Sequence, residues 1–249
     1  MKRLEGKVAV VTGAASGFGE GIARRFAEEG ATVVVADVND RGAERVRDAI
    51  GGEAIAVTAD VSRRSDVEGL VYAARSAFGR IDLMVNNAGF THRKGDLLTV
   101  DEPSFDLIGA VNMKAIYLST LAVVPIMERA GGGVIINTAS IAGIRPQPGL
   151  TWYNASKGWV IAATKSMAVE LAPRGIRVNC ICPASGETPM LPMFIGKDTP
   201  ASRAEIAADI PLGRLAQPLD VANAALWLAS EEAAFVTGIA LEVDGGSSI

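Results

Sequence analysis

Short apolar segments rich in β-branched residues alternate along the chain with longer segments whose apolar residues recur every three to four positions. The short segments predict strands at residues 8–12, 32–36, 54–58, 83–85, 134–138, 177–182 and 240–243. The longer segments predict amphipathic helices at residues 18–29, 41–50, 65–78, 101–130, 152–172 and 218–229. The predicted strands show no apolar–polar alternation, which is typical of strands buried on both faces. This order predicts an α/β fold with a single doubly wound parallel sheet of about seven strands and helices on both faces.

One segment departs from this alternation. Residues 183–211 contain five prolines and no clear strand. A connection of this length in a compact domain is usually functional, and this one directly follows a predicted strand. We therefore expect one domain over residues 1–249, with the proline-rich segment at 183–211 as a substrate loop or lid.

Composition narrows the functional class. The chain has 249 residues, of which 49% are hydrophobic and 21% are charged, as is typical of a globular protein. Its net charge of −4 and the lack of a basic stripe argue against a nucleic-acid partner. The sequence shows neither a signal-peptide pattern nor an uninterrupted apolar stretch of membrane-spanning length. We therefore expect a cytoplasmic protein with no membrane partner.

The cysteine and histidine content disfavours a metal site. Cys180 and Cys182 flank Ile181 in a predicted strand, where we expect buried thiols that point to opposite faces and do not pair. His92 is the only histidine. One histidine cannot readily form a His-rich zinc site or a Ser–His triad, so we expect chemistry without a metal.

Three glycines follow the first predicted strand, where the first helix begins. The run Gly13-Ala14-Ala15-Ser16-Gly17-Phe18-Gly19 has the spacing G-x-x-x-G-x-G. Glycines at such a turn let the backbone approach a pyrophosphate, whose charge is stabilised at the helix N-terminus. The turn predicts a dinucleotide site in a fold of Rossmann type.

Asp37 ends the second predicted strand. A carboxylate there can accept hydrogen bonds from both hydroxyls of an adenosine ribose, and it would repel the 2′-phosphate of NADP. No Arg or Lys occurs within residues 14–19 to neutralise that phosphate. We therefore expect NAD (NADH) as the cofactor.

Tyr153 and Lys157 lie four residues apart in a predicted helix, so both side chains emerge on one face. A phenol with a free pKa of about 10 is a poor acid or base at neutral pH. An ammonium one helical turn away stabilises the phenolate and lowers that pKa. The pair predicts a proton-transfer centre, although the spacing alone also occurs on helix surfaces.

In order and spacing, the glycine turn, the run Asn86-Asn87-Ala88-Gly89, Ser140 and the Tyr153/Lys157 pair together resemble the short-chain dehydrogenase/reductase family. The likeness covers essentially the whole chain. It implies that Tyr153 is the general acid/base toward the substrate oxygen and that Ser140 hydrogen-bonds the same oxygen. It also implies that Lys157 holds the nicotinamide ribose, while Asn112 resembles the helix asparagine that holds a water linking Lys157 to solvent.

The resemblance implies the cofactor contacts as well. The matching positions are Gly13, Ser16, Gly17, Phe18, Gly19, Asp37, Asp60, Val61, Asn86, Ala88, Gly89, Tyr153, Lys157, Pro183 and Thr188. Ala184 departs from the pattern, since the family commonly has glycine after this proline. Because alanine tolerates fewer backbone conformations, we expect a different loop path above the nicotinamide.

The loops after the predicted strands nominate a substrate pocket. Its expected residues are Phe90, His92, Arg93, Ile141, Arg145, Gln147, Trp152, Met190 and Met193. Aromatic and thioether surface suits a carbon skeleton. The cations on these loops could meet an anionic group, although lone loop cations are most often solvated.

We therefore expect an NAD-dependent oxidoreductase that interconverts a secondary alcohol and a ketone of a small-molecule substrate by hydride transfer. The alternatives are a 3-oxoacyl thioester reductase, which the run Pro211-Leu212-Gly213-Arg214 also resembles, and a sugar or polyol dehydrogenase. A non-catalytic NAD-binding regulatory module is remote, because the residues that match the catalytic set are intact. The resemblance also implies a homotetramer or a homodimer.

Overall fold

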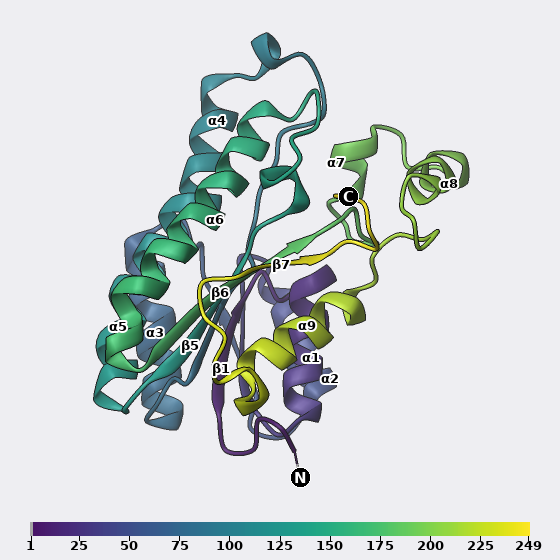
Figure 1. Ribbon diagram of the computed structural model, residues 1–249. Helices are drawn as coiled ribbons and strands as arrows, with labels where there is room; N and C mark the ends of the chain where they lie inside the picture. The colour runs from purple at the N-terminus through teal and green to yellow at the C-terminus, as the bar shows by residue number, and fades with distance from the viewer. Residues whose placement is uncertain (1) are drawn as a thin grey trace.

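A seven-stranded parallel sheet with the strand order β3-β2-β1-β4-β5-β6-β7 forms the centre of the protein (Figure 1). The computed structural model describes residues 2–249. The strands are β1 (Val8–Thr12), β2 (Thr32–Asp37), β3 (Ile55–Thr58), β4 (Leu83–Asn86), β5 (Gly133–Thr138), β6 (Ile176–Pro183) and β7 (Ala240–Val243). The predicted α/β fold and its strands are therefore confirmed, with ends that differ by a residue.

Nine α-helices accompany the sheet within the described residues: α1 (Gly17–Glu28), α2 (Asp40–Ile50), α3 (Arg64–Phe78), α4 (Glu102–Ile108), α5 (Ala115–Arg129), α6 (Thr151–Leu171), α7 (Leu191–Ile195), α8 (Pro200–Ala208) and α9 (Pro218–Ala229). Short 3₁₀ turns are η1 (Leu97–Thr99), η3 (Ile141–Gly143), η4 (Ala172–Arg174) and η5 (Glu231–Ala233). The helix predicted over residues 101–130 is divided by a π-helical segment, η2 (Gly109–Lys114). The proline-rich segment contains α7 and α8, both with proline in the first turn, where its missing N–H costs nothing.

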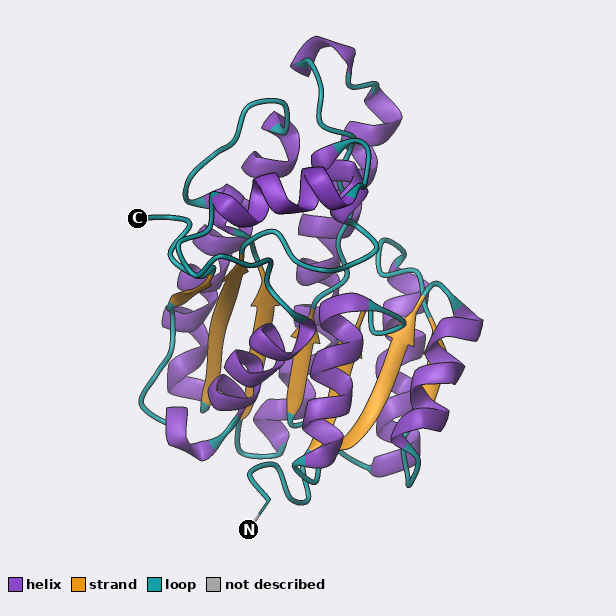
Figure 2. Ribbon diagram, turned by 90° about the vertical axis from the view of Figure 1, so that its right-hand side faces the viewer, coloured by secondary structure: helices purple, strands orange, loops and turns teal. Residues whose placement is uncertain are grey.

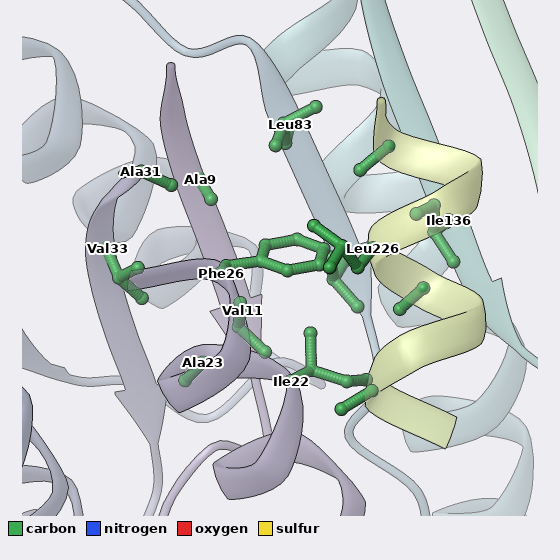
Figure 3. Packing of buried hydrophobic residues seen from close by; sticks show 14 of the residues in the cluster. Ala9, Val11, Ile22, Ala23, Phe26, Ala31, Val33, Leu83, Ile136 and Leu226 are labelled. Atoms are coloured by element: carbon green, nitrogen blue, oxygen red, sulfur yellow. The ribbon is translucent and has the colours of Figure 1, made fainter. Parts of the chain in front are cut away.

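The helices form one layer on each face of the sheet (Figure 2). Helices α1, α2 and α9 cover one face, where Phe26 packs among Val11, Val33 and Leu226 (Figure 3). Helices α3, α5 and α6 cover the other face, against strand residues such as Val10. Successive strand residues point to opposite faces, and because both faces are covered each strand is apolar throughout.

Strand β1 pairs with β2 on one side and with β4 on the other, so the order of strand addition reverses at β1. The chain leaves the sheet at the same edge from every strand, because all the paired strands are parallel. In such sheets the gap outside the carboxyl ends at the reversal point is the usual ligand site. This edge brings together the glycine turn and the loops that follow β2, β4, β5 and β6.

The expectation that Cys180 and Cys182 point to opposite faces was wrong. Both thiols are buried in one cluster with Ala139 and Val160, whereas Ile181 lies on the opposite face. Side chains two residues apart in a strand share a face, and this strand is regular across the pair. Both cysteines are free.

The continuous helical segment Glu102–Arg129, made of α4, η2 and α5, is long and apolar enough to cross a membrane by length and composition, with a mean hydropathy of 1.6. The core helix of a globular protein passes the same test. Here Val123 and Met127 of α5 are fully buried against the sheet and α3. The burial of these side chains therefore accounts for part of the segment's apolar character.

Candidate active site

A cavity of about 690 Å³ follows the carboxyl edge of the sheet. Its walls come from the glycine turn, the ends of β2 and β3, the loops after β4, β5 and β6, and helix α6. Many of the residues nominated from the sequence line it: Gly13, Ser16, Gly17, Phe18, Asp37, Asp60, Val61, Ala88, Gly89, Ser140, Tyr153, Lys157, Pro183 and Thr188. The structure therefore places these fourteen residues around one continuous space, whereas Gly19, Asn86 and Asn112 lie outside its lining.

The glycine turn is packed too tightly for side chains. Gly13 has φ +64°, and a Cβ there would lie 2.8 Å from the Cα of Ala88. A Cβ on Gly19 would overlap the carbonyl oxygen of Gly13, so Gly19 supports the turn from behind and does not line the cavity. These close approaches explain why the turn is built from glycine.

The N-terminus of α1 opens into this cavity. Ser16 is the N-cap residue, yet its side chain makes no capping hydrogen bond. Ser16, Gly17 and Phe18 all line the cavity. The first N–H groups of a helix have no intrahelical acceptor, so this end of α1 suits an anionic group such as a pyrophosphate.

Two carboxylates lie along the far end of the cavity. Asp37 accepts hydrogen bonds from the N–H groups of Ala15 at 3.0 Å and Asn39 at 2.9 Å, one on each carboxylate oxygen. Each oxygen keeps a second lone pair, so the carboxylate can still accept from hydroxyl groups. Asp60 accepts from the N–H and the hydroxyl of Ser62 at 2.9 and 2.7 Å. This end fits the ribose hydroxyls of an adenosine, and among the described residues that line it there is no Arg or Lys; the nearby Arg45 donates to the Ala15 carbonyl at 2.9 Å.

The loop after β4 is fastened to the glycine turn. The Thr12 hydroxyl accepts from the N–H groups of Asn87 and Ala88 at 3.0 and 3.2 Å, and it donates to the Val85 carbonyl at 3.2 Å. The Asn87 amide donates to the carbonyl of Gly13 at 3.2 Å. These bonds hold the loop after β4, which lines the cavity, at a fixed distance from the glycine turn.

In the run Asn86-Asn87-Ala88-Gly89, Asn86 alone does not line the cavity. Its side chain is buried, donates to Asn137 Oδ1 and accepts from the Ser119 hydroxyl, both at 2.8 Å. Asn137 in turn donates to Thr164 on α6 at 2.9 Å. Asn86 therefore ties β4 to β5 and α5 and lies outside the cavity lining, where Asn87 takes the position facing the cavity.

Tyr153 and Lys157 lie on one face of α6, buried to 7% and 4% exposure. The Lys157 ammonium donates to the carbonyl of Thr138 at 2.8 Å and lies 5.7 Å from the centre of the Tyr153 ring. Burial lowers the pKa of Lys157 to about 8. Burial also raises the pKa of Tyr153 to about 12, against the opposing hydrogen bond with the Ser140 hydroxyl.

The predicted lowering of the tyrosine pKa is therefore not what the structure shows. The reason is desolvation, which disfavours the phenolate, while the neighbouring ammonium is directed at a backbone carbonyl. At neutral pH Tyr153 is a protonated phenol. It is consequently set up as a proton donor to an oxygen placed in the cavity.

Ser140 follows β5 and caps the short η3 turn. Its Oγ accepts from the N–H of Ala142 at 3.1 Å, which leaves its own O–H to donate to the Tyr153 phenol or to an oxygen placed in the cavity. Gly143 brings this turn against α6, since a Cβ there would lie 2.6 Å from the backbone carbon of Lys157. This close approach holds Ser140 beside Tyr153.

Asn112 lies in the π-helical segment, directly behind the cavity lining. Its Oδ1 accepts from the N–H of Phe90 at 2.8 Å, and its Nδ2 donates to the Phe90 carbonyl and to the Ser156 hydroxyl, both at 2.9 Å. A Cβ at Gly89 would lie 3.6 Å from both Asn112 Oδ1 and Lys157 Nζ. The asparagine thus fixes the loop after β4 and presents its oxygen to the same small space as the lysine.

The end of the cavity at Tyr153 continues into an apolar compartment. Of the residues nominated for the substrate, Phe90, Ile141, Gln147, Met190 and Met193 line it. The sequence reasoning did not name Thr91, Leu107, Ala142, Leu150 or Phe194, which also line it. The ring of Phe194 lies edge-on to that of Tyr153, with 5.3 Å between the ring centres. The sequence offered one indication that Phe194 lines the cavity: it directly follows Met193, a nominated residue of the proline-rich segment.

The remaining nominated residues lie outside the lining. His92 is buried, and its Nδ1 lies 2.8 Å from the Arg93 carbonyl. The Arg145 guanidinium donates to the carbonyl of Ser247 at 2.9 Å. Trp152 packs edge-on against Phe105, with 5.3 Å between the ring centres. Arg93 also lies outside the lining. Across residues 2–249, no group of three or more His, Cys, Asp or Glu side chains is placed to hold a metal ion.

Comparison with known proteins relates residues 13–248 to a family model described as enoyl-(acyl carrier protein) reductase. The chain is 47% identical to 4-formylbenzenesulfonate dehydrogenase of Comamonas testosteroni, over 99% of both chains. It is 41% identical to the 3-oxoacyl-[acyl-carrier-protein] reductase of Thermotoga maritima, over 98% of both chains. The crystal structure of a 3-ketoacyl-(acyl-carrier-protein) reductase from Brucella melitensis, complexed with NADH, has a TM-score of 0.94 and 48% identity, covering 99% of this chain and 100% of that one.

Proposed function

The chain belongs to the short-chain dehydrogenase/reductase family and is an oxidoreductase of that type, and we propose that it uses NAD to interconvert a secondary alcohol and a ketone. The observation that carries this proposal is the convergence of Ser140, Tyr153 and Lys157 on one cavity that begins at a dinucleotide-type glycine turn. The catalytic roles follow from the chemistry of these side chains at their observed positions.

When bound, NAD supplies or accepts the hydride. In the reducing direction Tyr153, which is protonated at neutral pH, donates its proton to the substrate oxygen as negative charge develops there. The O–H of Ser140 donates a hydrogen bond to the same oxygen and stabilises that charge. In the oxidising direction Tyr153 must first lose its own proton, and its phenolate then accepts the alcohol proton.

Lys157 and Asn112 support the proposed proton transfer without contacting the substrate oxygen. The buried ammonium of Lys157 would hold the nicotinamide ribose and place positive charge near the phenol when Tyr153 gives up its proton. Asn112 keeps Phe90 in place and presents its oxygen to the space beside the lysine, which supports a role in relaying the proton to solvent. The Lys157 ammonium would stabilise the phenolate formed during turnover.

The proposed preference is for NAD over NADP. Asp37 lines the adenosine end of the cavity, and its carboxylate suits ribose hydroxyls. Support also comes from the relative of Brucella melitensis, whose structure holds NADH. The residues proposed to hold the dinucleotide are those of the glycine turn, Asp37, Asp60, Val61, Ala88, Gly89, Pro183 and Thr188.

We place the chain in one domain, with residues 183–211 as a lid. The lid reaches over both halves of the cavity: a Cβ on Gly17 would lie 3.1 Å from the Thr188 methyl, and Phe194 contacts Tyr153. A homotetramer or homodimer in the cytoplasm is proposed from the family. It is supported by large exposed apolar side chains on α5 and α6: Tyr117, Leu121, Trp159 and Val169.

The second candidate is the reduction of a 3-oxoacyl thioester, because the relatives from Thermotoga maritima and Brucella melitensis are named for that activity. The deciding experiment follows NADH absorbance with a panel of secondary alcohols and ketones and with acetoacetyl-CoA, using NAD(H) and NADP(H) in parallel. Turnover of simple ketones with NADH supports the first proposal. Turnover of the thioester alone supports the second, and failure with every compound while NADH binds would contradict both.

A further inference from the structure

Resting on the proposed function, we infer that this site takes a compact, uncharged alcohol or ketone with an apolar body, such as an aryl or alicyclic carbinol. The compartment beyond Tyr153 is bounded by Phe90, Ile141, Leu150, Met190, Met193 and Phe194. Aromatic and thioether surfaces of this kind bind a hydrocarbon ring by contact and exclusion of water. Phe194, edge-on to Tyr153, brings that surface next to the reacting oxygen.

The compartment offers no ionic partner to a charged substrate. Among the described residues, the ionic side chains that line the cavity are Asp37, Asp60 and Lys157. The two carboxylates lie at the adenosine end, and the lysine donates to the Thr138 carbonyl beneath the catalytic tyrosine. Arg145, the cation nominated from the sequence, binds the Ser247 carbonyl outside the lining. A carboxylate or sulfonate would lose its hydration here without gaining a cation.

Polar partners for additional hydroxyl groups are equally scarce. Apart from the catalytic residues, the polar side chains that the described loops and lid contribute to this side of the lining are Thr91, Gln147, Ser185 and Thr188. The Thr91 hydroxyl already donates to the His92 carbonyl at 3.0 Å. Thr188 lies against Gly17 at the glycine turn, so Gln147 and Ser185 are left as partners, fewer than the hydroxyls that a sugar or polyol would bury.

Backbone hydrogen bonds tie the loop after β4 to the lid and to the loop before α6. The N–H of Lys94 donates to the Met193 carbonyl at 2.9 Å, and the N–H of Gly95 donates to the Gly149 carbonyl at 3.0 Å. Two adjacent residues thereby join the lid to the loop before α6. A compact molecule needs no room beyond the compartment, whereas a thioester has a long phosphorylated arm that must extend outside it.

The test uses ketones that share one reacting group. Acetophenone, 4-acetylbenzenesulfonate, acetoacetyl-CoA and a keto-sugar are reduced with NADH, and kcat/KM is compared. We expect acetophenone to exceed the sulfonate by about 100-fold or more, because an unpaired buried charge costs at least two decades in rate. Equal or faster reduction of the sulfonate, the thioester or the keto-sugar would overturn the inference and leave the oxidoreductase proposal intact.

A gain-of-function variant tests the physical cause. Met190→Lys places a cation in the compartment wall and should raise kcat/KM for the sulfonate about 10-fold while lowering that for acetophenone. The matched control is Ala201→Lys, which adds the same charge at an exposed position of α8 in the lid. If both variants change the sulfonate rate equally, the charge acts by long-range attraction and the inference about the compartment fails.

Binding separates this inference from the proposed function. Calorimetry measures the affinity of acetophenone and of 4-acetylbenzenesulfonate for the NADH-loaded protein, whether or not turnover occurs. Tight binding of the uncharged ketone alone, without turnover, would contradict the proposed reaction and support the compartment inference. Equal or tighter binding of the sulfonate would overturn the inference on its own.

Discussion

The buried ammonium of Lys157 donates to the backbone carbonyl of Thr138, at the carboxyl end of the strand that leads to Ser140. The bond fixes the lysine beneath the phenol of Tyr153, and burial keeps the lysine pKa near 8. The geometry that serves the proposed reaction therefore carries a cost in stability that depends on pH.

We predict that the wild-type protein gains stability relative to Lys157→Met as the pH rises from about 8 to about 10. In this window the unfolded lysine, with a pKa of about 10.5, still holds its proton while the folded lysine has lost it, so stability rises with pH. The gain approaches about 3 kcal/mol, and the burial cost is fully present below pH 8. Urea unfolding of both proteins at a series of pH values and fixed protein concentration measures it. Lys165→Met, at an exposed position of the same helix, should keep the wild-type pH dependence.

Tyr153→Phe should lower kcat by about 10³-fold, because the ring remains and only the proton donor is lost. NADH binding, followed by its fluorescence, should stay close to wild type. Tyr72→Phe removes the same hydroxyl at a 73% exposed position and serves as the control. If Tyr153→Phe keeps wild-type turnover, another group moves the proton.

Asp37→Ser should lower kcat/KM for NAD about 10-fold and raise that for NADP, because it removes both an acceptor for ribose hydroxyls and a charge that repels a 2′-phosphate. Asp48→Ser, which removes an exposed carboxylate paired with Arg47, should leave both values unchanged. Steady-state kinetics with each cofactor measures the ratio. A wild-type enzyme that prefers NADP would show that Asp37 does not face the ribose.

Gly19→Ala should abolish NADH binding and destabilise the protein by about 1–3 kcal/mol, because its methyl would overlap the Gly13 carbonyl oxygen and force the turn open. Gly69→Ala is the matched control, since a Cβ there meets nothing within 4 Å on the exposed side of α3. That change should raise stability by about 0.5–1 kcal/mol. Thermal unfolding and NADH fluorescence separate the two outcomes.

Local sequence rules were sufficient for the strands and for the shared helix face of Tyr153 and Lys157, but not for α7, α8 or the π-helical segment. Strands buried on both faces are continuous apolar runs, so their positions can be read directly from the sequence. Tyr153 and Lys157 share a face because a helix repeats every 3.6 residues, whatever surrounds it. The glycine turn is equally local, since close backbone approach excludes a Cβ.

Packing between segments distant in sequence decided which side chains of a loop face the cavity, and local rules could not predict this. Asn86 and Asn87 are adjacent in sequence, and only the pairing of β4 with β5 decides that the first is buried in the sheet while the second faces the cavity. Phe194 meets Tyr153 because the lid folds back over the sheet edge, a contact between residues distant in sequence.

The sequence by itself determined that Tyr153 and Lys157 share one face of a helix and that a tight glycine turn follows β1, because both depend on spacing within one helix or one turn. The tertiary structure decided the electrostatics of those groups. Burial places the pKa of Tyr153 at about 12, opposite in direction to the value expected from its lysine neighbour alone. Desolvation depends on every element packed around a group, and no local pattern in the chain records it.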